Sequence, residues 1–433
     1  MDKAQLYVFI GIGGIVVFLA LIFAGIIPGL PGEETKPATI TFWGFQNRET
    51  WQEIFKRYEI ERPNIKVNYI QKNPASFEDD FVNTLARTQT PDVIMFPAEY
   101  IEKHANKLTP APANLMSERQ LKEEQVDAAQ MFWSSARKSI IGVPMTADAL
   151  VLYSNNNLFA KEFILSPPLT WDKALLYAQK LTKKDAAGNI LVAGIGMGRA
   201  RNIKHADDAL TALFLQFGDQ IADSSGQIVF GNPVSRGGVE VMPAESALQF
   251  FTDFSNPKKS SHSWSYSLPE AQEMFLTGKL GMYIGYISEY AEIKAKNPHL
   301  DVSVSLFPQL TGASRPTTFG KLSLLSVSRT SRNQVAAWDF VQFATSPKIL
   351  MIFANTAGNV APRRDLLGEY DKEAARSVFA KSIFYLTLWP NPDPPAVQNI
   401  FRIMIEEVAF GQKTIGNAIR DAKTLLINIV KAQ

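Results

Sequence analysis

Strand patterns alternate with helix patterns along this chain, and the alternation constrains its fold more than any other feature. Residues 39–43 and 65–70 place apolar side chains at every second position, which predicts two strands. Between them, residues 51–58 repeat apolar side chains at helical spacing. A second helix pattern at 77–85 precedes an uninterrupted apolar run at 92–96, typical of a strand buried on both faces. This order predicts a parallel sheet with crossover helices.

The alternation continues through the rest of the chain. Further strands are expected at 149–153, 280–286, 302–307 and 322–327, and further helices at 171–181, 288–297, 336–344 and from 397 onward. The 433 residues are more than one hydrophobic core usually organises. We therefore expect an α/β protein with more than one lobe.

An apolar run without a charged side chain covers residues 6–27. A helix of this length can cross a hydrocarbon core of about 30 Å. A core helix and a cleaved signal peptide are the alternatives, but the run is terminal, long, and lacks a clear small-x-small cleavage site. Lys3 precedes the run and Glu33 follows it, which predicts a body outside the cytoplasm. Residues 1–37 are therefore expected to form a single-pass anchor in the cell membrane, with a short tether.

Composition and motifs exclude several kinds of chemistry. The chain has no cysteine, which removes disulfides, thiolate metal sites, thiol nucleophiles and a lipid anchor on cysteine. Its net charge of +2 argues against a nucleic-acid partner and suits an uncharged solute. The four histidines are too widely spaced for a helical metal site, and we expect them at the surface. Asp207 and Asp208 are expected to face solvent, while a glycosidase pair made from distant acids stays possible.

Aromatic residues near predicted strand ends are candidates for ligand contact. Trp43 ends the first strand, and ligands in open α/β sheets bind beyond the carboxyl ends of the strands. Trp264 has only small or polar neighbours, which predicts an exposed indole able to stack on a sugar face. Local packing is the alternative for both side chains. Tyr286 and Glu289 lie at a predicted strand-to-helix junction, and Tyr100 follows the strand at 92–96.

An ordered set of segments resembles one protein family. The segments are Ile-Thr-Phe-Trp-Gly at 40–44, Tyr-Glu-Ile-Glu-Arg-Pro-Asn-Ile-Lys-Val at 58–67, Thr-Pro-Asp-Val at 90–93, Gly-Val-Pro-Met-Thr-Ala-Asp-Ala-Leu-Val-Leu-Tyr-Ser-Asn at 142–155, Pro-Pro-Leu-Thr-Trp-Asp at 167–172 and Ala-Ala-Trp-Asp-Phe at 336–340. Together they resemble the carbohydrate-type extracellular solute-binding proteins of ABC importers, the family that includes maltose-binding protein. Each motif alone is weak, but the ordered set, which extends over 38–425, is specific.

The resemblance implies a fold and a function. It implies a two-lobed, periplasmic-binding-protein-like α/β fold of type II, with a hinge that the chain crosses three times. Residues 38–148 with 321–348 would form the first lobe, and 149–320 with 349–433 the second. A monomer without cofactor or catalysis would bind a sugar or oligosaccharide between the lobes and deliver it to an ABC permease. A membrane-anchored glycan-active enzyme and a ligand-sensing module are the alternatives.

By position, the resemblance and the strand-end argument together select eight residues for ligand contact. They are Trp43, Gln46, Tyr100, Asp148, Trp264, Tyr286, Glu289 and Arg363. For Arg363, an ion pair with Asp365 is the alternative. Ser154 and Ser288 stand where the family often has Tyr and Trp, which weakens two expected sugar contacts.

Overall fold

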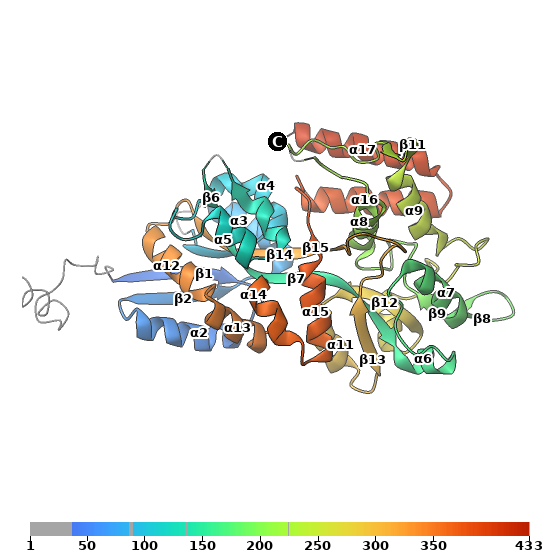
Figure 1. The fold of residues 1–433 in the computed structure, drawn as a ribbon, viewed down its shortest axis with the longest axis horizontal. Coiled ribbons are helices and arrows are strands. Elements are labelled where there is room, and N and C mark those ends of the chain that lie inside the picture. The colour runs from blue at the N-terminus through green and yellow to red at the C-terminus, as the bar shows by residue number, and fades with distance from the viewer. Residues whose placement is uncertain (1–36, 86–89, 136, 224, 433) are drawn as a thin grey trace, which may run out of the picture.

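A computed structural model describes residues 37–85, 90–135, 137–223 and 225–432. Figure 1 shows two lobes placed along the longest axis of the molecule, with the described N-terminal end at the outer side of the first lobe. Among the described residues, no helix is both long and apolar enough to cross a bilayer. The predicted anchor at 6–27 lies outside the described residues.

The alternation predicted for the first part of the chain is confirmed. Strand β1 (Ala38–Gly44) pairs in parallel with β2 (Ile65–Gln71) on one side and with β3 (Val93–Pro97) on the other. The connections contain α2 (Arg48–Glu61) and α3 (Phe77–Leu85), since parallel neighbours need crossover connections. Ile40 and the last three residues of β1 are buried, while Thr39 near its start is exposed.

The first lobe also contains short elements and two later helices. They are α4 (Ile101–His104), α5 (Glu118–Glu124), α12 (Gln334–Ala344), α13 (Pro347–Thr356), β4 (Leu108–Thr109), β5 (Trp133–Ser134) and β6 (Ser139–Ile140). Its core is aromatic: Phe42 of β1 contacts Trp51 at 4.8 Å between ring centroids and Phe340 of α12 at 5.5 Å. Burial of such large rings dominates the stability of a lobe of this size.

The second lobe is built mainly from the middle and the end of the chain. Its helices are α6 (Asn156–Lys161), α7 (Trp171–Leu181), α8 (Ala206–Phe217), α9 (Pro243–Asp253), α10 (Ala271–Leu276), α11 (Glu289–Lys296), α15 (Ala374–Phe384), α16 (Pro394–Ala409) and α17 (Ile415–Lys431). Its strands are β8 (Lys183–Lys184), β9 (Ile190–Ile195), β10 (Val234–Arg236), β11 (Val239–Val241), β12 (Leu280–Tyr286) and β13 (Val302–Leu306). These elements surround their own buried core (Figure 1).

Two long strands join the lobes. The first half of β7 (Gly142–Asn155) pairs with β14 (Thr318–Ser328), and its second half pairs with β12 and β13 of the second lobe. Strand β14 in turn pairs with β3 in the first lobe and with β15 (Leu386–Thr387) near its start. One sheet of 11 strands therefore runs through both lobes. The predicted changes of lobe at 148/149 and 320/321 fall inside these two strands.

The third passage lies later than predicted. Helix α13 packs against α2 of the first lobe, where the Phe353 ring lies 4.6 Å from the Trp51 ring. The next long helix, α15, packs against β13 and β7 of the second lobe, with the short α14 (Arg364–Leu367) before it. The chain thus changes lobe between α13 and α15, and the predicted change at 348/349 is wrong. The apolar stripe of α13 marks a buried helix, but it does not identify the lobe that covers it.

Candidate functional site

A cavity of about 400 Å³ lies between the lobes beside the hinge strands. It is lined by Gln46, Asn47, Thr50 and residues 356–359 of the first lobe, Thr146 of β7, and Ile287, Ser288 and Ala291 of the second lobe. Its volume is within the range of small-molecule sites, which hold a few placed polar groups in a concave wall. Any solute in this cavity would therefore contact both lobes.

The first-lobe wall is fixed by the start of α2. The Asn47 side chain caps this helix, because its Oδ1 accepts hydrogen bonds from the Thr50 backbone N–H at 3.1 Å and the Thr50 hydroxyl at 2.6 Å. Gln46 comes just before the cap, and its carbonyl accepts a hydrogen bond from the Tyr69 hydroxyl. Its Oε1 is buried without a hydrogen-bond partner among the described residues. Gln46 therefore lies at the cavity, as the sequence predicted, with an unused acceptor.

Asp148 connects the hinge to the second-lobe wall. Its Oδ1 accepts a hydrogen bond of 3.1 Å from the backbone N–H of Ser288, which lines the cavity. Burial raises the pKa of Asp148 to about 6, although Ser288 and Lys321 act in the opposite direction. Lys321 is its register partner on β14, so this pair of opposite charges lies across the two hinge strands.

A charged cluster surrounds Lys321 at the hinge. We call Glu99, Asp148, Asp208, Tyr286 and Lys321 the cleft cluster: Glu99 follows β3 in the first lobe, while Asp208 and Tyr286 belong to the second. Lys321 is an exposed residue, and its Nζ lies 5.2 Å from the centroid of the Tyr286 ring. Burial lowers the pKa of Lys321, but Asp208, Glu99 and Asp148 together raise it above its ordinary value. Charged side chains from both lobes and from the hinge strands therefore interact with Lys321.

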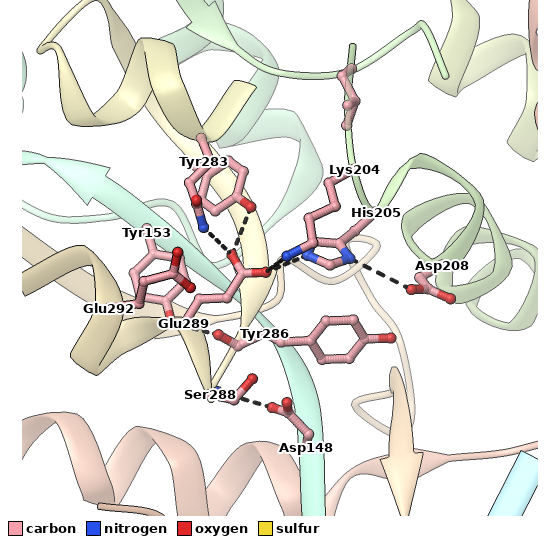
Figure 2. Close-up of polar contacts among 12 residues, drawn as sticks. Asp148, Tyr153, Lys204, His205, Asp208, Tyr283, Tyr286, Ser288, Glu289 and Glu292 are labelled. Atoms are coloured by element: carbon pink, nitrogen blue, oxygen red, sulfur yellow. Dashed lines mark hydrogen bonds and ion pairs between the residues drawn. The ribbon is translucent and has the colours of Figure 1, made fainter. Parts of the chain in front are cut away.

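Behind Tyr286 lies a buried network centred on the Glu289 carboxylate (Figure 2). Glu289 accepts hydrogen bonds from the His205 Nε2–H, from the Tyr283 hydroxyl at 2.7 Å and from Gln272 at 3.1 Å. Burial lowers the pKa of His205, but hydrogen bonds to Asp208 and Glu289 raise it to about 9. His205 is therefore an imidazolium at neutral pH. Its ring meets the Tyr286 ring edge-on at 4.8 Å, which fixes the orientation of that tyrosine.

Several sequence predictions about this region were wrong. Glu289 is at the predicted junction, but it is buried in the network and bonded to protein groups. His205, expected at the surface, is its buried partner. Asp207, expected to face solvent, is buried and bonded to Arg402 at 3.0 Å. These partners are far apart in the sequence, so no local pattern could reveal them.

Both tryptophans selected from the sequence are buried in the structure. Trp264 is 0% exposed, and its indole N–H donates a hydrogen bond of 3.1 Å to Asn202, so the predicted exposed indole is wrong. The hydroxyl of its neighbour Ser263 donates a hydrogen bond to the Ile195 carbonyl, so this polar segment can be buried in the core. Trp43 is only 6% exposed, and the Lys72 ammonium lies 4.0 Å from its ring centroid.

Tyr100 and Arg363 are also held by protein contacts. The half-buried Tyr100 ring lies 6.0 Å from the Phe77 ring, and burial raises the pKa of Tyr100 to about 12. Arg363 forms ion pairs of 3.0 Å with Asp365 and with Glu124, which confirms the structural alternative for this residue. Of the eight selected residues, the structure brings Gln46, Asp148 and Tyr286 to the site. Within the described ranges, no group of acidic or imidazole side chains forms a metal site.

Sequence reasoning missed three residues of the cleft cluster. Glu99 follows the buried strand β3, and the strand-end rule that selected Tyr100 applies equally to it. Lys321 is a single charged residue in an apolar strand, which is a signal of a hinge or site position. Asp208 gave no such signal, because a charged residue near a helix start is common.

Comparisons with known proteins agree with this architecture. A family model described as bacterial extracellular solute-binding protein matches residues 44–351. A binding protein of Brucella abortus (strain 2308) is 24% identical over 204 residues, which are 47% of this chain and 46% of the relative. The chain thus spans about half the length of the curated relatives it matches.

Solved structures of similar fold cover almost the whole chain. The cyclic α-maltosyl-1,6-maltose binding protein from Arthrobacter globiformis has a TM-score of 0.76 and 16% identity, covering 92% of this chain and 100% of its own. An ABC transporter solute-binding protein from Thermotoga lettingae TMO, bound with α-D-tagatose, has a TM-score of 0.66 and 22% identity, covering 90% and 99%. The family model matches most of the chain, and the chain has the two lobes and the hinge of these structures. The chain therefore belongs to the bacterial extracellular solute-binding proteins.

Proposed function

We propose that this protein is the extracytoplasmic substrate-binding protein of an ABC importer and that it binds a sugar or oligosaccharide between its lobes. The observation that carries the proposal is the cavity of about 400 Å³, which is lined by both lobes and by a hinge strand. Polar side chains from both lobes line it, including Gln46, Asn47 and Ser288. Such groups suit a solute rich in hydroxyl groups.

The comparisons support this proposal indirectly. The Thermotoga lettingae protein was solved with a sugar, and a cyclo/maltodextrin-binding protein of the same fold was solved with maltotetraose. Their sequence identities of 22% and 16% relate the folds and not the individual binding residues. The sugar assignment for this chain therefore depends on the test described below.

Binding would be coupled to a change in the angle between the lobes. A solute that contacts both walls stabilises the closed form more than the open form, so it shifts the population towards closure. A permease that recognises the closed form would then receive only loaded protein. The two hinge strands and the segment between α13 and α15 are the places where the bend would occur.

The apolar run at 6–27 completes the proposal. As an uncleaved membrane helix it would keep the body on the extracytoplasmic side, close to its permease. Tethering raises the effective concentration of one partner at the other without any new contact. The absence of cysteine makes this helix the natural anchor, because lipid attachment at cysteine is impossible.

A glycan-active enzyme is the second candidate, because Glu99, Asp148 and Asp208 all act on Lys321 at one cleft. A glycosidase needs two such carboxylates, one of them with a raised pKa. Burial raises the pKa of Glu99 and of Asp148, as that role would require. The names of the relatives favour binding, since they describe binding proteins and not hydrolases.

A thermal-unfolding screen of the full-length chain tests the proposal. The detergent must carry no sugar headgroup, because a maltoside would itself compete for the cleft. A solute at 100 times its Kd stabilises the folded state by about 2.7 kcal/mol. The same samples are then analysed for hydrolysis products. Stabilisation without turnover supports a binding protein, turnover supports the enzyme, and no response to any saccharide contradicts both.

A further inference from the structure

An ion pair joins the two lobes away from the hinge strands. Lys103 lies on α4 of the first lobe, and its Nζ is 3.1 Å from Oδ2 of Asp393, which directly precedes α16 of the second lobe. Neither residue belongs to β7 or β14, and Figure 1 shows α4 and α16 above these two strands. A rotation that opens the lobes on this side would therefore separate Lys103 from Asp393.

The first-lobe half of the pair has a second partner in its own lobe. The Lys103 Nζ lies 2.7 Å from Oε1 of Glu78 on α3, and the same oxygen is 3.0 Å from Nε2 of His104. Burial lowers the pKa of Lys103, but hydrogen bonds to Glu78 and Asp393 raise it above its ordinary value. Separation from Asp393 would leave Lys103 charged and still paired with Glu78, so the contact can break and form again at low cost.

The second-lobe half is held in position by the start of α16. Asp393 caps this helix, because its Oδ1 accepts a hydrogen bond of 3.3 Å from the backbone N–H of Ala396. Pro394 and Pro395 follow the cap, and their rings fix the backbone of the first turn. One carboxylate oxygen therefore holds the helix while the other contacts Lys103. The orientation of Asp393 is set before the lobes meet.

The exposure of the pair limits its strength. The Lys103 side chain is 32% exposed and the Asp393 side chain 27% exposed. Ion pairs that water reaches change a folding or conformational equilibrium by a factor of about two to five. A contact of this strength can bias the angle between the lobes, but it cannot lock them.

We propose that Lys103 and Asp393 form a releasable clasp that favours the closed arrangement of the lobes even when no solute is bound. The inference goes beyond the proposed function, because it concerns the free protein. A clasp that maintains a closed population would leave the solute less free energy to supply on binding. Since the pair is partly exposed, added salt would weaken it.

The distance between the lobes tests the inference directly. The chain has no cysteine, so two introduced cysteines can carry a donor and an acceptor dye at defined positions. Val335→Cys on α12 and Leu425→Cys on α17 place one exposed dye on each lobe. Single-molecule energy transfer in the full-length protein, without saccharide and at low ionic strength, measures the ratio of open to closed molecules.

Three substitutions in this labelled protein assign the ratio to the clasp. Asp393→Asn removes the charge and keeps the cap, because Asn caps helices as well as Asp does. It should raise the open-to-closed ratio about two- to fivefold. Lys103→Gln should give the same rise, and the double variant no further rise. Asp80→Asn is the matched control, since Asp80 pairs with Lys72 at 2.9 Å inside the first lobe, and it should leave the ratio unchanged.

Salt provides a second measurement that needs no substitution in the clasp. Between 0.01 M and 1 M salt the screening length falls from about 30 Å to about 3 Å. The open-to-closed ratio of the labelled wild type should then rise to that of Asp393→Asn, whereas the ratio of Asp393→Asn should change little. This comparison is decisive even if a variant folds poorly, which thermal unfolding would reveal.

The outcomes separate cleanly. A rise in Asp393→Asn and in Lys103→Gln that Asp80→Asn lacks, and that salt reproduces in the wild type, supports the clasp. Equal ratios in all proteins and at both salt concentrations overturn it, and so does an equal rise in Asp80→Asn. These measurements use no saccharide, so their failure would leave the proposed function standing.

Discussion

Two groups of charged side chains at the hinge end of the second lobe differ in how they are partnered. Around Glu289, every charged or hydroxyl group is bonded to another protein group, and the network is buried (Figure 2). Around Lys321, which is exposed, the Glu99 and Asp148 side chains are half-buried. Glu289 begins α11 just after β12, and Asp148 lies on the neighbouring strand β7. Glu289 accepts hydrogen bonds from three side chains, whereas Asp148 accepts one from the Ser288 backbone. The presence of a charge at a strand end therefore does not by itself identify a binding residue.

Removing the cation of the closed network should have the largest effect. His205→Ala leaves the buried Glu289 carboxylate with only the exposed Lys204, 3.5 Å away, as a charge partner, which should cost about 3–5 kcal/mol of unfolding free energy. Urea unfolding of the variant and of the wild type measures the difference. His205→Gln retains a hydrogen-bonding group without the charge, so its loss should be smaller. A loss below about 1 kcal/mol for His205→Ala would show that the network is not structural.

Trp264→Ala should lower stability without weakening saccharide binding, because Trp264 is buried in the core. The fully buried indole leaves a large cavity when it is removed, so we expect a loss of about 3–5 kcal/mol in unfolding free energy. At temperatures where the variant is folded, its saccharide affinity should be close to that of the wild type. A variant of normal stability with weakened binding would restore the stacking role predicted from the sequence.

The open carboxylates should make binding depend on pH. Asp148 has a pKa of about 6 and faces Ser288, Lys321 and Glu289. A donor on the solute would favour its ionised form, so the affinity should be full above pH 6 and fall below it. The loss approaches about tenfold per pH unit well below that pKa. Calorimetric titration between pH 5 and 7 measures it.

Asp148→Asn is the control for this profile. The amide cannot titrate, so the variant should bind the solute more weakly but with a flatter dependence on pH. An unchanged slope in Asp148→Asn would assign the pH dependence to another group, such as Glu99, whose pKa burial also raises.

Tyr286→Phe should have the smallest effect. The variant deletes the buried hydroxyl and keeps the ring against His205, so its stability should stay within about 0.5 kcal/mol of the wild type. Loss of one hydrogen bond to the solute should weaken binding by about 0.5–1.5 kcal/mol. Equal affinities in the two proteins would mean that this hydroxyl does not reach the solute.

The fold could be predicted from the sequence further than the site could. The spacing of apolar residues in β1, β2, β3 and α2 is a local property, and the structure has these elements where the pattern placed them. Partners across long separations left no such signal. His205 and Glu289 are 84 residues apart, and Arg402 is 195 residues from Asp207. Their burial depends on how the second lobe closes on itself, which no local window contains.

Trp264 shows why polarity of the neighbours was misleading. The Ser263 hydroxyl donates to the Ile195 carbonyl and the Ser265 hydroxyl bonds to the Ser267 hydroxyl, so the segment is polar in composition but satisfied internally. In contrast, Gln46 and Asp148 were selected because each lies at a point fixed by the topology: a strand end and a hinge crossing. Their place in the fold could be predicted, and their contact with a solute stays a prediction.

The position of Asp148 and Lys321 on the two hinge strands has a kinetic consequence. In a hinged protein, atoms near the axis travel the shortest arcs, so this pair would keep nearly the same spacing if the lobes swing. The first encounter with a charged solute would then take place on a surface that is already set. Discrimination by charge would appear in the association rate and would weaken with added salt. Discrimination by shape would appear later, in the lifetime of the closed form.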